Sequence, residues 1–267
     1  MKHQSVARLG IKRGLMATSL ALGVGLSAGS AIAAEGLNQH ADEILQSMSK
    51  FLAGTKAFSV TADISNEFIT TEAQKLQLNS HATVLMERPS RFQVTRKGRF
   101  ADVALFFDGS KLTVYGKTAN AYLQKDVAGT IDQAIAALEA ESGLSLPGAD
   151  LLLSNPYKVL TSGVTSSGYH GMANVGGVQC HHLAFRTPQI DWQIWVKDGA
   201  EPLPMKYVIT TKWLAGAPQY SVELSNWNTK PAITADNFKF AVPQGAKRLQ
   251  ALAVDETGEF APSGEGK

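Results

Sequence analysis

Apolar and polar residues alternate with a period of two along most of the chain, and this pattern predicts many short β-strands. The first run covers residues 58–64, where Phe58, Val60, Ala62 and Ile64 alternate with small or polar residues. Such alternation is typical of a strand with one buried face. Similar runs follow at residues 76–84, 91–96, 103–107, 112–115 and 122–123. Between two of them, Asp108-Gly109 predicts a tight hairpin turn, because Gly readily adopts positive φ.

Residues 176–227 contain four further strand-like runs and all four tryptophans, Trp192, Trp195, Trp213 and Trp227. We expect residues 205–213 to form one long strand with Tyr207 and Trp213 on the same face. Trp192 and Trp195 are three positions apart, so they should lie on opposite faces of their strand. A last strand is expected around residues 238–242. The Ser-, Gly- and Thr-rich residues 162–177 are expected to form irregular surface chain.

Two segments change to a helical period. Residues 38–54 place apolar side chains at spacings of three and four, with Asn38 as a plausible N-cap and Gly54 just beyond the end. Residues 129–143 contain a capping box formed by Thr130 and Gln133, and Gly143 should end the helix. The apolar segment 144–157 is expected to form a short helix or a packed loop that serves as a lid.

The first residues have the three parts of a secretory leader. A basic start with four Lys or Arg residues precedes the apolar run 15–26, which is too short to span a bilayer core of about 30 Å. Ala31-Ile32-Ala33 fits a cleavage site, so we expect a signal peptide at residues 1–33 and a periplasmic mature chain. An uncleaved membrane anchor is the competing interpretation. Residues 34–249 are expected to form a single domain, and residues 250–267 a disordered tail.

Charge and cysteine content argue against a nucleic-acid-binding protein and against a disulfide-stabilised domain. Removal of the leader takes its four basic residues with it and lowers the net charge from +2 to −2. The mature chain therefore lacks the positive charge that favours nucleic-acid binding. Cys180 is the single cysteine, so the domain has no internal disulfide and depends on its apolar core.

The sequence offers little support for catalysis, and we expect no enzymatic activity, no cofactor and no metal site. His181 and His182 follow Cys180, but neighbouring residues of a strand point to opposite faces and do not readily share one ion. The expected mature chain contains no G-x-S-x-G elbow, no dinucleotide-binding glycine motif and no P-loop.

Aromatic and apolar residues instead suggest a concave binding surface. An ordinary aromatic core is the alternative interpretation for each of them. The candidates to line a cavity are Phe92, Phe106, Tyr122, Leu152, Trp192, Tyr207 and Trp213.

The order of strands and two helices favours a mainly β (α+β) fold, a long antiparallel meander of about eleven strands curled around helices. The runs RPSRFQVTR, FFDGSKLTVY, GGVQCHHLAF, DWQIWV, PLPMKYVITT, PQYSVELSNWN and DNFKFAVP are similar to a family of predicted periplasmic proteins, a domain of unknown function with a LolA/LolB-like fold.

The resemblance implies a curled antiparallel half-barrel whose open side is plugged by helices. In lipoprotein carriers of this fold an arginine latches the lid, and Arg91 or Arg96 could correspond to it. We therefore expect non-covalent binding of a hydrophobic ligand, a lipid or the acyl chain of a lipoprotein in an apolar cavity. The alternative is a periplasmic sensor or assembly protein that binds another protein. The mature chain should contain no transmembrane segment.

Overall fold

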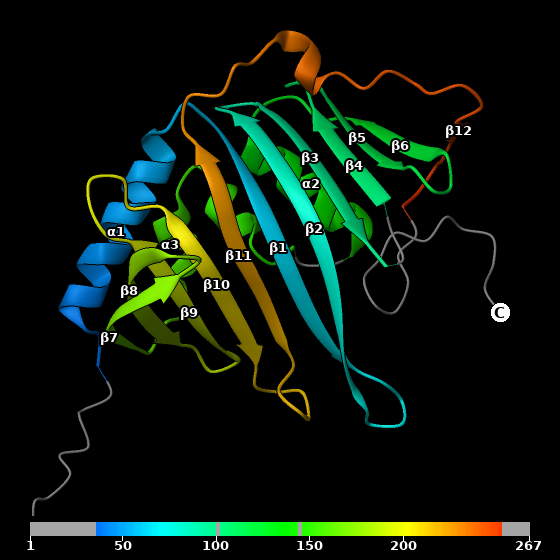
Figure 1. The fold of residues 1–267 in the computed structure, drawn as a ribbon. Coiled ribbons are helices and arrows are strands. Elements are labelled where there is room, and N and C mark those ends of the chain that lie inside the picture. The colour runs from blue at the N-terminus through cyan, green and yellow to red at the C-terminus, as the bar shows by residue number, and fades with distance from the viewer. Residues whose placement is uncertain (1–35, 100–101, 144–145, 253–267) are drawn as a thin grey trace, which may run out of the picture. The chain divides into compact units, whose positions relative to one another are not determined.

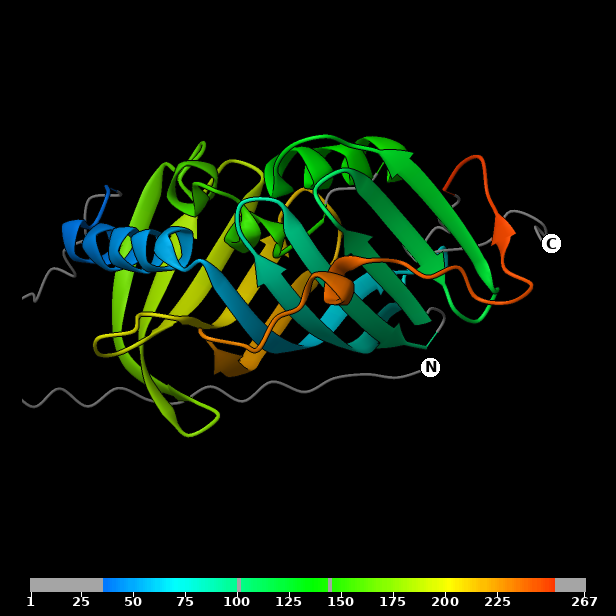
Figure 2. The same cartoon turned by 90° about the horizontal axis from the view of Figure 1, so that it is seen from above.

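Two antiparallel meanders meet at one long strand, β1 (Ala57–Ile69), in the computed structural model, which describes residues 36–99, 102–143 and 146–252. β1 pairs with β2 on one side and with β11 on the other. The twelve strands form one sheet in the order β12-β6-β5-β4-β3-β2-β1-β11-β10-β9-β8-β7. Since β12 and β7 lie at opposite ends of this order, the sheet is curled but not closed (Figure 1, Figure 2).

Short connections explain the antiparallel order, because consecutive strands joined by tight turns pair with each other. The first meander comprises β1, β2 (Lys75–Glu87), β3 (Arg91–Gly98), β4 (Asp102–Phe107), β5 (Lys111–Gly116) and β6 (Ala121–Asp126). The second comprises β7 (Ser166–Val175), β8 (Val178–Arg186), β9 (Ile190–Lys197), β10 (Pro204–Thr211) and β11 (Gln219–Asn228). β12 (Lys247–Arg248) is a two-residue strand that pairs with β6 in parallel.

Helices connect the two meanders and precede the first. They are α1 (Gln39–Gly54), α2 (Ile131–Ser142), the 3₁₀ helix η1 (Ala149–Leu152) and α3 (Pro156–Leu160). The predicted caps are confirmed: Asn38 accepts a hydrogen bond from the Ala41 amide at 2.9 Å, and Thr130 and Gln133 form a capping box. Gly143 ends α2 in the left-handed conformation, whereas Gly54 is still helical and Thr55 caps α1.

The register of the strands gives the sheet one apolar face. Phe58 lies opposite Met86, and Met86 lies opposite Phe92, so all three side chains share a face. The buried residues of α1, α2, η1 and α3 belong to the same apolar core. We call this the inner face and name α1, α2, η1 and α3 together the helical cover. Figure 1 shows α2 behind the strands of the first meander.

The opposite, outer face is mostly polar but carries an aromatic cluster on the first meander. The Phe240 ring lies 5.5 Å from the Phe106 ring, 5.3 Å from the Tyr115 ring and 5.2 Å from the Tyr122 ring, centroid to centroid. Phe240 follows the 3₁₀ helix η2 (Ala235–Phe238), so the chain after β11 crosses back over the first meander. This segment therefore covers apolar side chains that β4, β5 and β6 direct away from the helices.

The structure confirms the predicted curled antiparallel sheet with few helices and corrects four details. The expected irregular segment 162–177 contains β7, since its Ser and Gly residues pair with β8. The expected strand at residues 238–242 is the end of η2 followed by irregular chain. The long strand around Tyr207 ends at Thr211, and Trp213 lies in the following turn. The sheet has twelve strands instead of about eleven.

The expected signal peptide lies outside the described residues. Of the expected disordered tail, residues 250–252 are described, and Leu252 packs against the core.

Candidate functional site

A row of aliphatic side chains crosses the inner face from β1 to β6. Each member lies opposite the next: Val60, Val84, Val94, Leu105, Val114 and Leu123. The ends of the row are buried, whereas Val84, Val94 and Leu105 keep part of their surface exposed. The helical cover therefore leaves the middle of an apolar strip partly accessible.

Aromatic rings flank this row on both halves of the inner face. Phe92 and Phe107 lie 5.6 Å apart in the first meander. In the second meander, Trp192 stacks on Phe185 at 4.0 Å and meets Tyr207 edge-on at 5.8 Å. Such pairs add to the stabilisation by apolar burial, and they give the inner face a rigid apolar wall.

The structure places the seven cavity candidates in three environments. Phe92, Trp192 and Tyr207 lie on the inner face and are buried, and Leu152 packs on the same core from η1. Phe106 and Tyr122 lie on the outer face beneath Phe240. Trp213 is 70% exposed in the turn between β10 and β11. Four candidates are thus brought together. Phe106 and Tyr122 lie elsewhere because register, not composition, decides which face a strand residue occupies, and Trp213 lies elsewhere because its strand ends at Thr211.

Arg88 joins the sheet to two parts of the helical cover. Its Nε donates to the carbonyl of Leu52 at 3.3 Å, near the end of α1, and its Nη1 donates to the carbonyl of Leu152 at 2.9 Å, at the end of η1. Burial lowers the pKa of the guanidinium, and the nearby carboxylate of Asp132 opposes this effect. A cation at two helix ends interacts favourably with the carbonyl groups there, of which that of Leu52 also accepts from the amide of Thr55 at 3.3 Å.

Two further polar contacts hold the same segment. Asp132, in the first turn of α2, accepts hydrogen bonds from the amide of Ser154 at 2.9 Å and from its hydroxyl at 2.6 Å. The hydroxyl of Tyr157, on α3, donates to Asp42 of α1 at 2.6 Å. The segment from η1 to α3 is therefore fixed at its borders by a few directional contacts as well as by apolar packing.

A carboxyl group of this segment lies in partly apolar surroundings. Burial raises the pKa of Asp150, on η1, and the charge of Glu139 raises it further. Asp150 interacts electrostatically with the hydroxyls of Tyr207 and Tyr220, and burial is the main cause that raises the pKa of Tyr220 to about 12. Both phenols therefore stay neutral at physiological pH, and the charge of Asp150 has no described ion pair to stabilise it.

The histidines near Cys180 occupy separate environments. His181 lies 3.2 Å from the hydroxyl of Tyr169 and 3.1 Å from a carboxylate oxygen of Asp198, whereas His182 stacks on Trp195 at 4.2 Å. Cys180 is buried, and burial raises the pKa of its thiol. Within the described ranges, no three His, Cys, Asp or Glu side chains are arranged to hold a metal ion.

Two shallow hollows lie on the outer face of the sheet. The first, of about 520 Å³, is lined by polar residues that include Asp63, His81 and Lys97. The second, of about 320 Å³, lies beside Thr83 and Thr95. Neither hollow exposes the aromatic residues of the inner face.

Sequence reasoning missed the residues that hold the helical cover. The resemblance pointed to Arg91 or Arg96. Arg91 pairs with Glu87 on the outer face, whereas Arg96 lies on the inner face, donates to Ser80 at 3.0 Å and interacts electrostatically with Tyr220. Arg88 makes the contacts to Leu52 and Leu152 instead. In the sequence, its position directly before Pro89 indicates a break between strands. It does not indicate a contact with carbonyl groups far along the chain.

These features define a class of protein: an open, curled antiparallel sheet whose apolar inner face lies under separate short helices. Within this class, the chain belongs to the DUF2092 family, described as predicted periplasmic proteins, because the family model matches residues 41–252. The family resemblance predicted from the sequence is confirmed. No curated protein matches the chain. Among the described residues, no helix is long and apolar enough to cross a membrane.

Several solved structures are similar to the chain at low identity. An uncharacterized conserved protein from Thermus thermophilus has 12% identity and a TM-score of 0.46, with 79% of this chain and 99% of that chain covered. Lipoprotein LppX from Mycobacterium tuberculosis has 11% identity and a TM-score of 0.41, with coverages of 73% and 98%. A LolA superfamily protein from Nitrosomonas europaea has 10% identity and a TM-score of 0.38, with coverages of 75% and 97%. All three TM-scores lie below 0.5, so the site is described from this chain's own contacts.

Replacing Arg88 by Gln should loosen the segment from η1 to α3. The change removes charge-assisted hydrogen bonds to Leu52 and Leu152, which are worth about 1.5–3 kcal/mol when partly buried. Amide hydrogen exchange followed by mass spectrometry should show faster exchange in residues 149–160, with the strands of the second meander unchanged.

Arg91→Gln is the matched control, since Arg91 forms an outer-face ion pair worth at most about 1 kcal/mol. Equal exchange of residues 149–160 in the two variants would contradict a special role for Arg88.

Replacing Asp150 by Asn should stabilise the protein at neutral pH. The pKa of Asp150 is raised in the folded state, so the folded protein holds this proton more tightly than the unfolded chain. Stability therefore falls as pH rises from the unfolded pKa through the raised folded pKa. Urea unfolding between pH 4 and 8 should show the advantage of the variant shrinking toward low pH. An advantage independent of pH, or a less stable variant at pH 7, is the opposing result.

Proposed function

We propose that the protein is a non-catalytic periplasmic binding protein that holds an acyl chain or a similar apolar ligand between the inner face and the helical cover. Its signal peptide would be removed after Ala33. The observation that carries the proposal is the aliphatic row from Val60 to Leu123, whose ends are buried and whose middle members remain partly exposed. A strip of this kind offers an extended chain continuous apolar contact across several strands.

The energetics favour a reversible opening of the cover. Burial of a ligand contributes about 0.8 kcal/mol per CH₂ group, so a long acyl chain offsets the loss of several polar contacts. The contacts to be broken are those of Arg88 with Leu152 and of Asp132 with Ser154. Burial and the charge of Glu139 disfavour the ionised form of Asp150, which lowers the stability of the closed form at neutral pH. A ligand that binds only the open form then shifts the population toward it.

The aromatic residues have a defined place in this mechanism. Phe92, Trp192 and Tyr207 form the fixed wall on the strands, and Leu152 moves with η1. The two phenols of Tyr207 and Tyr220, both neutral, supply hydroxyl groups near Asp150 that can orient a polar end of the ligand.

Two neighbouring residues of β2 allow a matched test. Val84 points to the inner face and Leu85 to the outer face, and both are partly exposed. We expect Val84→Asn to weaken uptake of a fluorescent fatty acid about tenfold, because an amide in the apolar strip loses its hydration. Leu85→Asn should leave uptake unchanged. The measurement is fluorescence titration of purified mature protein without detergent.

One result is that the wild-type protein takes up the fatty acid and the two variants weaken uptake equally, and another is that neither variant weakens it. Either result would place the ligand away from the inner face. No uptake by the wild-type protein would contradict the proposed function. In that case, isolation of a complex with another periplasmic protein would favour a sensor or assembly role.

A further inference from the structure

The turn between β10 and β11 carries the most exposed aromatic side chain of the described residues. Trp213 is 70% exposed, and its neighbour Leu214 is 40% exposed. Trp192 is buried, and Trp195 and Trp227 are partly buried within the sheet. Together the two side chains form a small exposed apolar surface at a protruding turn.

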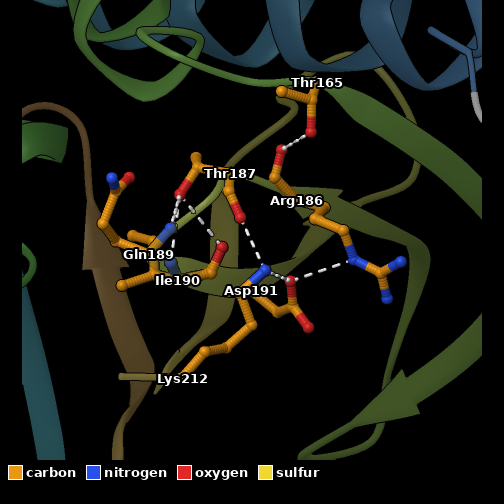
Figure 3. Close-up of polar contacts among 7 residues, drawn as sticks. All are labelled: Thr165, Arg186, Thr187, Gln189, Ile190, Asp191 and Lys212. Carbon is orange, nitrogen blue, oxygen red and sulfur yellow. Dashed lines mark hydrogen bonds and ion pairs between the residues drawn. The ribbon is translucent and has the colours of Figure 1, made fainter. Parts of the chain in front are cut away.

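This turn is held firmly at its base. Lys212 donates from Nζ to the carbonyl of Thr187 at 2.6 Å and to the carboxylate of Asp191 at 2.9 Å. Its backbone amide donates to the carbonyl of Gln189 at 3.0 Å. Figure 3 shows these residues gathered around the turn between β8 and β9, with Arg186 on the other side of Asp191.

The tip itself is also ordered. The amide of Ala217 donates to the carbonyl of Leu214, and the amide of Thr211 donates to the carbonyl of Pro218, both at 3.0 Å. At Gly216 φ is +81°, and an added Cβ there would lie 3.0 Å from the side chain of Ile69 at the end of β1. Trp213 and Leu214 are thus presented on a fixed hairpin and do not need to be ordered on binding, which lowers the entropic cost.

The tip is too small for a stable protein interface. A specific protein–protein interface buries about 800 Å² on each partner, whereas the tip offers one tryptophan and one leucine. A lipid bilayer, in contrast, accommodates single tryptophans at the level of its headgroups. Residues 212–218 contain no acidic side chain, so the tip itself does not repel phosphate groups.

We propose that Trp213 and Leu214 form a membrane-docking tip that inserts into the headgroup region of a phospholipid bilayer. This inference deepens the proposed function and rests on it, because docking places the protein where an acyl ligand enters or leaves. The contact is mainly apolar, since Glu72 at the neighbouring turn is exposed and Lys212 is already paired with Asp191. Binding therefore needs no anionic lipid and persists at high salt.

The test uses vesicles of phosphatidylcholine and phosphatidylethanolamine at millimolar lipid and the purified mature protein. Sedimentation measures partitioning, and quenching by brominated lipid reports the depth of tryptophan. We expect Trp213→Ser to lower partitioning about tenfold and Leu214→Ser to lower it less. Trp213→Phe should restore part of the binding. Val242→Ser is the matched control, since Val242 is 56% exposed outside the tip.

Absence of vesicle binding by the wild-type protein, or equal binding by Trp213→Ser and Val242→Ser, would overturn the docking tip. Uptake of a soluble fluorescent fatty acid, measured without vesicles, separates this result from the proposed function. Trp213→Ser should take up the fatty acid as the wild-type protein does. Vesicle binding without any fatty-acid uptake would retain the tip and reject the ligand-binding function.

Discussion

The pairing of β1 with both β2 and β11 is the constraint on which the rest of the structure depends. It joins two meanders into one sheet whose end strands, β12 and β7, lie too far apart in the order to pair. An unclosed sheet of this length has an apolar face that needs a cover. With a single cysteine the chain has no internal disulfide, so burial of that face by helices supplies the stability.

The helical cover consists of separate short helices, and these are held on the sheet in two ways. Apolar residues such as Leu45 and Leu138 hold α1 and α2 on the sheet without directional demands. Arg88, Asp132 and Tyr157 instead fix the borders of the segment from η1 to α3 by hydrogen bonds. An apolar ligand can replace the apolar contacts between this segment and the sheet. It cannot replace the hydrogen bonds, which are intact in the closed form and broken in the open form. The same segment thus combines a stable closed form with a defined way to open.

The sequence predicted those parts of the fold that depend on local pattern. The capping box at Thr130 and the turn at Asp108 follow from neighbouring residues, and both are confirmed. β7 was missed because its Ser and Gly residues acquire strand structure only by pairing with β8. Phe106 was expected in a cavity but faces outward, since a shift of one residue reverses every side chain of a strand. The contact of Arg88 with Leu152 joins residues far apart in sequence and has no local signature.

Lipid extraction and mass spectrometry of the mature protein, purified from periplasm without detergent, show whether the inner face holds an acyl chain. We expect an acyl-chain species in stoichiometric amount, because an apolar ligand held between the inner face and the helical cover should remain bound through purification. A ligand-free protein that also fails to take up added fatty acid would contradict it. The inner face would then be an ordinary core, and the function would lie on the outer surface.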